Sequence, residues 1–117
     1  MIIVVAALEF DTQEARDRAV ELTRDVQLAT RVEEAGCHDY CFAPDPCVDT
    51  RIQVYELWTD EESLAAHFQH PNYFNMGMAL RDCGISGSDN RKYRVDATEP
   101  VYDDSHTPRA DFFTRAD

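Results

Sequence analysis

The sequence predicts one α+β domain, in which helices cover one face of an antiparallel sheet. The chain has 117 residues, of which 44% are hydrophobic and 29% are charged, and these values are typical of a single globular domain with a small core. Strand-like and helix-like segments follow one another in the order β-α-β-β-α-β. This order is the ferredoxin-like arrangement.

The first two elements are predicted by the apolar pattern of the first 36 positions. Residues 2–8, IIVVAAL, form a continuous apolar run rich in β-branched residues, which predicts a buried strand. Asp11 followed by Glu14 resembles a capping box at the start of a helix. Apolar residues then recur at helical spacing, so we expect one long amphipathic helix from about residue 12 to about residue 34, ended by Gly36.

The middle of the chain predicts an antiparallel hairpin with a turn that contains proline. Its first strand is residues 37–43, CHDYCFA, and alternation places three side chains on one face: His38, Tyr40 and Phe42. Its second strand is residues 51–58, RIQVYELW, with one face made of Ile52, Val54, Glu56 and Trp58. Two alternating runs joined by a short polar segment are typical of such a hairpin.

A second helical region follows the hairpin and is divided by a proline. Thr59 with Glu62 repeats the capping pattern and predicts a helix that runs to about residue 68. His70-Pro71 interrupts this helix, because the residue before proline is disfavoured in helical conformation. Proline suits the first position of a helix, so a further short helix is expected over residues 72–82.

The last part of the chain predicts one more strand and then a tail. Residues 85–90, ISGSDN, have loop composition, and residues 91–97, RKYRVDA, alternate like a strand. We therefore divide the chain into a folded domain of residues 1–97 and an acidic, proline-containing tail of residues 98–117. The polar composition favours a solvated tail, whereas its aromatic residues favour a tail that packs on a partner subunit.

Charge and cysteine content exclude several classes of function. The net charge is −12, from 11 basic and 23 acidic residues, and such a field repels nucleic acids and anionic membranes. The start, MIIVVAALEF, has no basic region before its apolar run, so it reads as a strand and not as a signal peptide. A cytoplasmic location is expected, where the four cysteines are thiols and small buried apolar residues; no metal site is predicted.

The sheet is expected to be closed by a second copy of the chain. Helices cover one face of a small sheet, and the other face must be solvated or packed against another sheet. The first three predicted strands have apolar or aromatic residues on both faces. We therefore expect a homodimer or a higher homo-oligomer, with two sheets forming a dimeric α+β barrel.

An ordered set of short motifs runs through the predicted domain. The pattern E-x-x-G-C-x-x-Y precedes E-x-W, and a helix with A-x-H and then P-x-x-F follows. The residues are Glu33, Gly36, Cys37, Tyr40, Glu56, Trp58, Ala65, His67, Pro71 and Phe74. This set resembles the antibiotic biosynthesis monooxygenase family of small dimeric α+β barrels. The resemblance covers about residues 2–97 and leaves the tail outside.

The resemblance implies that the protein oxygenates a small aromatic substrate with dioxygen and without a cofactor. The substrate implied is an aromatic polyphenol, quinol or anthrone. Such chemistry needs a water-poor aromatic pocket and a base, and histidine is a suitable base because its ordinary pKa is about 6.5. His67, at the A-x-H position, is the candidate catalytic residue. Its alternative role is a structural hydrogen bond on the helix.

The remaining candidates are residues that we expect to line the substrate pocket. They are Trp58, Tyr73, Phe74, His38, Tyr40 and His70. Each also has a structural alternative: core packing for the aromatic residues and a surface loop for His70. Glu56 is unusual, since it is a carboxylate on an otherwise apolar strand face. We expect it to form an ion pair, with an arginine across the dimer, and a catalytic role is its alternative.

Two other functions remain open at this point. The first is a non-catalytic module of the same fold that binds a small molecule or mediates dimerisation. The second is heme degradation, which is disfavoured because the first strand lacks the asparagine of that branch and Met78 stands near its ligand position. The chain has four glycines and no G-x-G-x-x-G pattern, which argues against a nucleotide or flavin cofactor.

Overall fold

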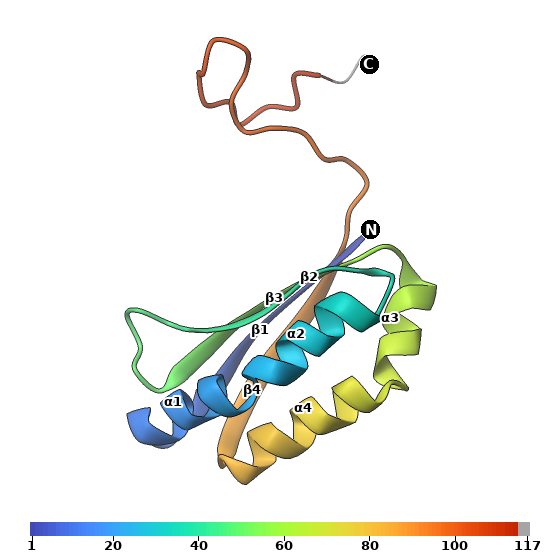
Figure 1. Cartoon of the computed structure of the whole chain (residues 1–117). Coiled ribbons are helices and arrows are strands. Elements are labelled where there is room, and N and C mark those ends of the chain that lie inside the picture. The colour runs from blue at the N-terminus through green and yellow to red at the C-terminus, as the bar shows by residue number, and fades with distance from the viewer. Residues whose placement is uncertain (115–117) are drawn as a thin grey trace.

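The predicted ferredoxin-like α+β fold is confirmed by a computed structural model, which describes residues 1–114. Its elements are β1 (Ile2–Phe10), α1 (Gln13–Leu22), α2 (Arg24–Glu33), β2 (Cys37–Pro44), β3 (Arg51–Trp58), α3 (Glu61–Phe68), α4 (Pro71–Asp82) and β4 (Ile85–Arg94). The strand order is β2-β3-β1-β4, and all neighbouring strands are antiparallel. The helices lie on one face of this sheet (Figure 1).

The core lies between the sheet and the helices, and the two central strands supply much of it. In the β1–β3 register Ile2 pairs with Trp58, Ala6 with Val54, and Leu8 with Ile52, and all six side chains are buried. The predicted apolar face of β3 is therefore confirmed. Because side chains alternate along a strand, this register fixes which residues of both strands face the helices.

The single long helix predicted for residues 12–34 is wrong, because the chain forms two helices that meet at Thr23. Thr23 is fully buried, and its hydroxyl donates a hydrogen bond to the Ala19 carbonyl at 2.7 Å. Its backbone has φ −93° and ψ 0°, outside the regular helix. A threonine hydroxyl bonded to the carbonyl four residues earlier commonly bends a helix, and here α2 takes a new direction.

Side chains of α2 cover the free edge of β2. The Gln27 amide accepts a hydrogen bond from the Phe42 backbone N–H at 2.9 Å and donates to its carbonyl at 3.4 Å. The Arg31 guanidinium donates to the Tyr40 carbonyl at 2.7 Å. These bonds satisfy backbone groups that an edge strand otherwise exposes. They also hold the end of α2 against the sheet.

The helix boundaries differ from the predicted capping residues by one position. Thr12, and not Asp11, caps α1 by accepting from Ala15 N–H, and Asp60, and not Thr59, caps α3 by accepting from Ser63 N–H. The predicted interruption at Pro71 is confirmed, since Pro71 is the first residue of α4. At the other end of α4, Gly84 has φ +78°, the left-handed conformation that commonly follows a helix.

The last strand is longer than predicted. Residues 85–90 were expected to form a loop, but they belong to β4, which pairs along nearly the whole of β1. The pairing overrides the poor strand propensity of glycine, serine, aspartate and asparagine. A register shift between Glu9 and Phe10 accommodates Ser86, whose hydroxyl donates to the Glu9 carbonyl at 3.2 Å.

Residues 98–114 extend away from the sheet and helices (Figure 1). They form a small structure of their own, in which Tyr102 and Pro108 make a bridge and Arg109 bonds the carboxylates of Asp103 and Asp111. Within the described chain, the hydrogen bonds of this segment join only its own residues. Residues 115–117 of the predicted tail lie outside the described residues.

The cysteines are free, but the expectation that all four are buried is wrong. Cys83 is buried, Cys37 and Cys41 are partly buried, and Cys47 is exposed. Burial, together with the nearby carboxylates, raises the pKa of the Cys37 thiol to about 11, so this thiol is protonated at neutral pH. Among residues 1–114, no helix has the length and apolarity that crossing a membrane requires.

Gly36 allows the start of α3 to approach the end of α2. A Cβ atom at Gly36 would collide with Cβ and Oγ of Ser63, so we expect Gly36→Ala to lower the free energy of unfolding by about 1–3 kcal/mol. Ser63→Gly in the same chain should recover part of this loss. Gly87→Ala is the matched control, because no atom lies within 4 Å of its added Cβ. Urea unfolding of Gly36→Ala, Ser63→Gly, the double variant and Gly87→Ala measures the coupling, and additive effects of the first two substitutions would contradict this explanation.

Candidate active site

A cavity of about 560 Å³ lies between the sheet and helices α3 and α4. This volume falls within the range of roughly 300–1,000 Å³ that is usual for small-molecule sites. Its floor is formed by apolar side chains of the two central strands: Val4, Ala6, Leu8 and Val54. Aromatic side chains form much of the wall: Tyr40, Phe42, Phe68, Tyr73 and Phe74. The cavity can therefore receive a flat apolar ring.

A few polar groups interrupt this apolar wall. Glu56 and His67 lie at the end near α3, whereas Arg81, Ser88 and Asn90 are contributed by α4 and β4. Ser88 and Asn90 are exposed, and Phe74 has 52% of its surface exposed. The cavity is therefore open to solvent between α4 and β4 and closed at the end that holds Glu56 and His67.

His67 is buried among aromatic rings. It lies on α3, and only 2% of its surface is exposed. Its ring centroid is 4.5 Å from that of Trp58, and 5.4 Å from those of Tyr40 and Tyr73. These contacts hold the imidazole in place, where it contributes to the cavity wall and reaches Glu34 at the end of α2.

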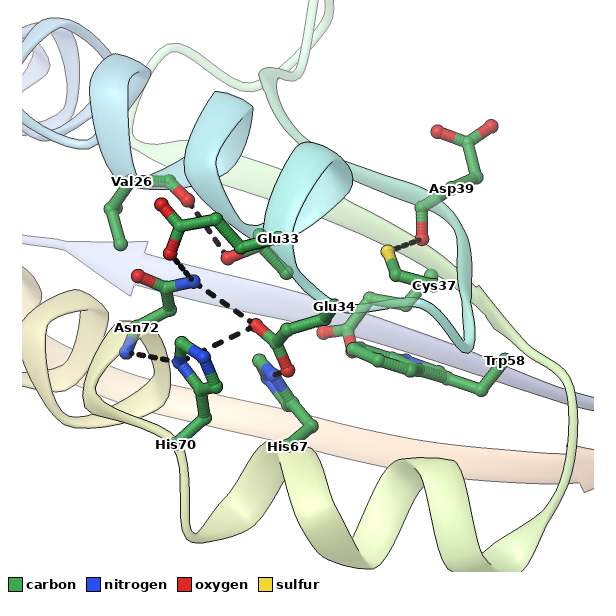
Figure 2. A network of polar contacts seen from close by, with 11 residues as sticks. Val26, Glu33, Glu34, Cys37, Asp39, Trp58, His67, His70 and Asn72 are labelled. Carbon is green, nitrogen blue, oxygen red and sulfur yellow. Dashed lines mark hydrogen bonds and ion pairs between the residues drawn. The ribbon is translucent and has the colours of Figure 1, made fainter.

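The ring edge that faces α2 is bonded to Glu34. Figure 2 shows His67 rising from α3 toward the Glu34 carboxylate, which reaches it from the end of α2. His67 Nδ1 lies 2.8 Å from Glu34 Oε1. Because a carboxylate accepts hydrogen bonds, the proton belongs on Nδ1. The other nitrogen, Nε2, then carries a lone pair, and no hydrogen bond within residues 1–114 uses it, while the His67 ring contributes to the cavity wall.

Burial and the Glu34 carboxylate have opposite effects on His67. Burial lowers the pKa of His67 below its ordinary value, because the surroundings disfavour the charged imidazolium, and the hydrogen bond to Glu34 partly offsets this shift. The pair is therefore a neutral imidazole bonded to a carboxylate at neutral pH, and not an ion pair. A proton taken up at Nε2 would create the imidazolium directly beside the carboxylate.

The Glu34 carboxylate is positioned by the start of α4. Asn72 Nδ2 donates to Glu34 Oε2 at 3.3 Å and to Glu33 Oε1 at 3.4 Å. His70 Nδ1 lies 3.9 Å from Glu34 Oε2, but this nitrogen accepts a hydrogen bond from Asn72 N–H at 3.0 Å. His70 therefore caps α4 and orients Asn72. Its longer contact with Glu34, also dashed in Figure 2, is an ion pair only when the His70 imidazole is protonated.

Glu56 is the second carboxyl group of the closed end. Its surface is 8% exposed, and Trp58 Nε1 donates to Glu56 Oε1 at 2.9 Å. Burial, with a smaller contribution from the Glu34 charge, raises the pKa of Glu56 to about 7, although the Trp58 bond opposes the shift. Within residues 1–114 no cationic side chain forms an ion pair with it, so the arginine expected from a partner stays a prediction.

Tyr40 adds a hydroxyl group to the same end of the cavity. Its surface is 1% exposed, and burial and the nearby Glu56 raise its pKa well above the ordinary value. Tyr40 therefore remains a neutral phenol and can donate a hydrogen bond. The closed end thus combines a base, a carboxyl group and a hydroxyl donor within an apolar wall.

The structure brings together four of the seven predicted site residues. His67, Tyr40, Tyr73 and Phe74 contribute to the cavity wall. Trp58 does not: it is fully buried behind His67 and Glu56, where its ring and its N–H fix both groups. The role of these residues in substrate binding stays a prediction.

The two other histidines among the predicted site residues, His38 and His70, lie outside the cavity wall. His70 is used as the cap of α4. The expectation that His38 shares a strand face with Tyr40 is wrong, because a register shift between Cys37 and Asp39 turns His38 outward. His38 is exposed and bonds the Thr59 hydroxyl at 2.8 Å. Bulges of this kind have no reliable signature in a single sequence.

Sequence reasoning did not identify Glu34 and Asn72 as site residues. Glu34 follows the last residue of α2, and its direction depends on the break at Thr23 and on the contact between α2 and α4. Glu56 could be recognised from the sequence as a candidate site residue, since it is the one charged residue on an apolar strand face. Among the described residues, no group of three or more His, Cys, Asp or Glu side chains is arranged to hold a metal.

The raised pKa of Glu56 predicts a pH-dependent loss of stability. Between the ordinary value of 4.5 and about 7, the folded protein holds a proton that the unfolded chain releases, so wild-type stability falls as pH rises through this window. Glu56→Gln keeps the acceptor for Trp58 but cannot ionise. We expect its stability relative to wild type to increase by about 3 kcal/mol across the window, at about 1.4 kcal/mol per pH unit.

Urea unfolding at several pH values measures this difference. Glu61→Gln is the control, because Glu61 is an exposed carboxylate on α3. The free energy of unfolding of Glu56→Gln is compared with that of wild type at about pH 4.5 and about pH 7.5. The same difference at both pH values would show that Glu56 ionises normally.

The comparisons with known proteins agree with the fold described above. A protein from Deinococcus radiodurans assigned to the antibiotic biosynthesis monooxygenases is 19% identical, has a TM-score of 0.77, and is matched over 88% of this chain and 100% of its own. SnoaB from Streptomyces nogalater, a cofactor-independent oxygenase, is 15% identical, with a TM-score of 0.63 over 85% and 96% of the two chains. At these identities the likeness shows the fold alone.

A third similar structure is a conserved protein from Methanosarcina mazei, which is 22% identical, with a TM-score of 0.67 over 80% of this chain and 92% of its own. No curated protein matches the chain. The family model for antibiotic biosynthesis monooxygenases matches residues 1–76, which include β1 to β3, α3 and the Glu34–His67 pair. The chain therefore belongs to the antibiotic biosynthesis monooxygenase family.

Proposed function

We propose that the protein is a monooxygenase that uses dioxygen, without a cofactor, to oxidise an aromatic polyphenol, quinol or anthrone. The observation that supports this proposal most directly is the Glu34–His67 pair at the closed end of an aromatic-lined cavity. It provides a base whose free nitrogen faces the space that a substrate ring would occupy. The fold that the chain shares with the cofactor-independent oxygenase SnoaB is consistent with it.

The reaction needs an electron-rich substrate anion. His67 Nε2 removes a proton from the phenolic hydroxyl, or from the acidic carbon of an anthrone, and the imidazolium formed is stabilised by Glu34. The neutral Tyr40 hydroxyl donates a hydrogen bond to the substrate oxygen as negative charge develops there. The apolar floor excludes water from the anion, and the anion transfers an electron to dioxygen.

The alternative is a non-catalytic module that binds a small molecule in the same cavity. Binding of an apolar ligand would require no buried base. The closed end nevertheless buries three ionisable or hydroxyl side chains, those of Glu56, His67 and Tyr40. Their desolvation costs free energy and would not strengthen such binding. This cost favours an enzyme. Heme degradation is tested by titration with hemin, since an unchanged Soret band would exclude it.

We also propose that the protein is a homodimer, closed as an α+β barrel through the sheet face opposite the helices. Ile3 lies between Leu57 and Tyr93 in the register, and Val5 lies beside Tyr55. Tyr55 and Tyr93 are 39% and 52% exposed, so this face offers a continuous apolar strip. Burial of such a strip against a second copy is a common solution for a single sheet.

The tail supports the same assembly. Val101, Tyr102 and Phe112 are between 57% and 61% exposed, although the segment is ordered by its own hydrogen bonds. Apolar side chains that project from the domain in this way are suited to packing on a partner subunit. The free thiols of residues 37, 41, 47 and 83 are consistent with a cytoplasmic location, which we include in the proposal.

Oxygen uptake with a reduced naphthoquinol or with anthrone tests the proposed reaction. We expect the protein to exceed the autoxidation rate, and His67→Ala to lower kcat by about a hundredfold or more, because it removes the base. His38→Ala is the matched control, since His38 is exposed and outside the cavity. Equal uptake with and without protein across a panel of quinols and anthrones would refute the enzymatic proposal.

Light scattering or sedimentation tests the dimer. We expect the wild-type protein to have twice the chain mass of 13.4 kDa. The double variant Tyr55→Asp/Tyr93→Asp should be a monomer, because each chain would bury two charges in the apolar interface. Val32→Asp, on an α2 position that is 75% exposed, should leave the dimer intact. A wild-type protein that sediments as one chain at micromolar concentration would contradict the assembly.

A further inference from the structure

One carboxyl oxygen of Glu56 has no hydrogen-bond partner among residues 1–114. Trp58 Nε1 donates to Glu56 Oε1, and within residues 1–114 no hydrogen bond is formed by Oε2 and no cation pairs with the carboxyl group. The side chain is more than nine-tenths buried and contributes to the cavity wall. A carboxyl group in such surroundings is costly unless it remains protonated or has a task.

We propose that Glu56 is a second catalytic residue of the cavity, which returns a proton to the oxygenated substrate after His67 has removed one. This inference rests on the proposed oxygenase function. His67 and Glu56 belong to the same closed end, and Trp58 lies against both of them. The two groups can therefore act on one bound ring.

The surroundings of Glu56 keep its proton available at neutral pH. Burial and the Glu34 carboxylate favour the neutral acid and raise its pKa to about 7. The other groups around it are the Tyr40 phenol and Cys37 thiol from β2, His67 from α3 and Tyr73 from α4. β1 contributes the uncharged Val4 opposite Glu56, and Lys92 of β4 lies one strand further away. Among residues 1–114 no cation is therefore close enough to remove the proton, and Glu56 faces the helices and the cavity, not the sheet face proposed to meet a partner and its arginines.

The proton transfers balance for an anthrone. His67 Nε2 takes one proton from the reacting CH₂ carbon. The carbanion gives one electron to dioxygen, and the two radicals combine in a C–O bond that leaves a peroxide anion. Glu56 gives its proton to the outer peroxide oxygen.

The second half of the sequence restores both side chains. The O–O bond breaks while the remaining C–H proton passes to the Glu56 carboxylate, and the departing hydroxide takes the proton from His67. The products are a carbonyl group and one water molecule. The carbon has been oxidised, dioxygen has been reduced, and His67 and Glu56 have returned to their starting forms.

The experiment separates the two proton transfers with Glu56→Gln and the probe dithranol, a dihydroxyanthrone. Mixed without oxygen, Glu56→Gln should form the absorbance of the bound anthrone anion at the wild-type rate, because His67 is intact. With oxygen, its kcat should fall by about a hundredfold or more, as expected for loss of a general acid. Glu61→Gln, on an exposed position of α3 outside the cavity wall, should match wild type in both measurements.

Each other outcome has a distinct meaning. Wild-type kcat in Glu56→Gln would overturn the inference and leave the proposed oxygenase intact. Equal losses of anion formation and kcat would overturn it too, since Glu56 would then act only by shaping the cavity. A wild-type protein without oxygen uptake would refute the proposed function itself. Infrared difference spectra between about pH 6 and about pH 8 add a direct readout. The wild-type protein should show a carboxylic acid C=O band that is missing from Glu56→Gln. If the wild-type protein lacks this band, the inference is also overturned.

Discussion

The hydrogen bond between Glu34 and His67 is the interaction on which the site depends. It joins the end of α2 to α3, two elements that are separated in sequence by the whole β2–β3 hairpin. Without the carboxylate, a buried imidazole could orient either nitrogen toward the cavity. The acceptor at Nδ1 removes this ambiguity and gives Nε2 its lone pair. It also stabilises the cation that forms when that lone pair accepts a proton.

The fold holds this pair by ordinary structural devices. The break at Thr23 redirects α2, and Gln27 and Arg31 fasten it along the edge of β2. Pro71 ends one helical segment and begins another, and this allows Asn72 to donate to Glu34 from the first turn of α4. The position of one carboxylate thus depends on three helices, which is the kind of support that a precise catalytic geometry requires.

Much of the fold follows from the sequence, whereas the details that build the site do not. The apolar face of β3 and the start of α4 at Pro71 were predictable because alternation and proline chemistry act locally. The extent of β4 was not, since residues 85–90 gain their strand structure from pairing with β1. Nor were the outward turn of His38 and the direction of Glu34, because a bulge and an interhelical contact determine them.

The charge state of the closed end explains why two carboxyl groups can share it. The proposed reaction needs Glu34 as an anion, because its carboxylate accepts from His67 and would stabilise the imidazolium. In the proposed reaction, an ionised Glu56 beside it would repel the substrate anion and would lack the proton that the peroxide requires. Burial raises the pKa of Glu56 to about 7, and no cation of residues 1–114 pairs with it, so its protonated form is available near neutral pH. The environment that is costly for a charge thus favours an acid. One cavity therefore holds a base and an acid at the same pH.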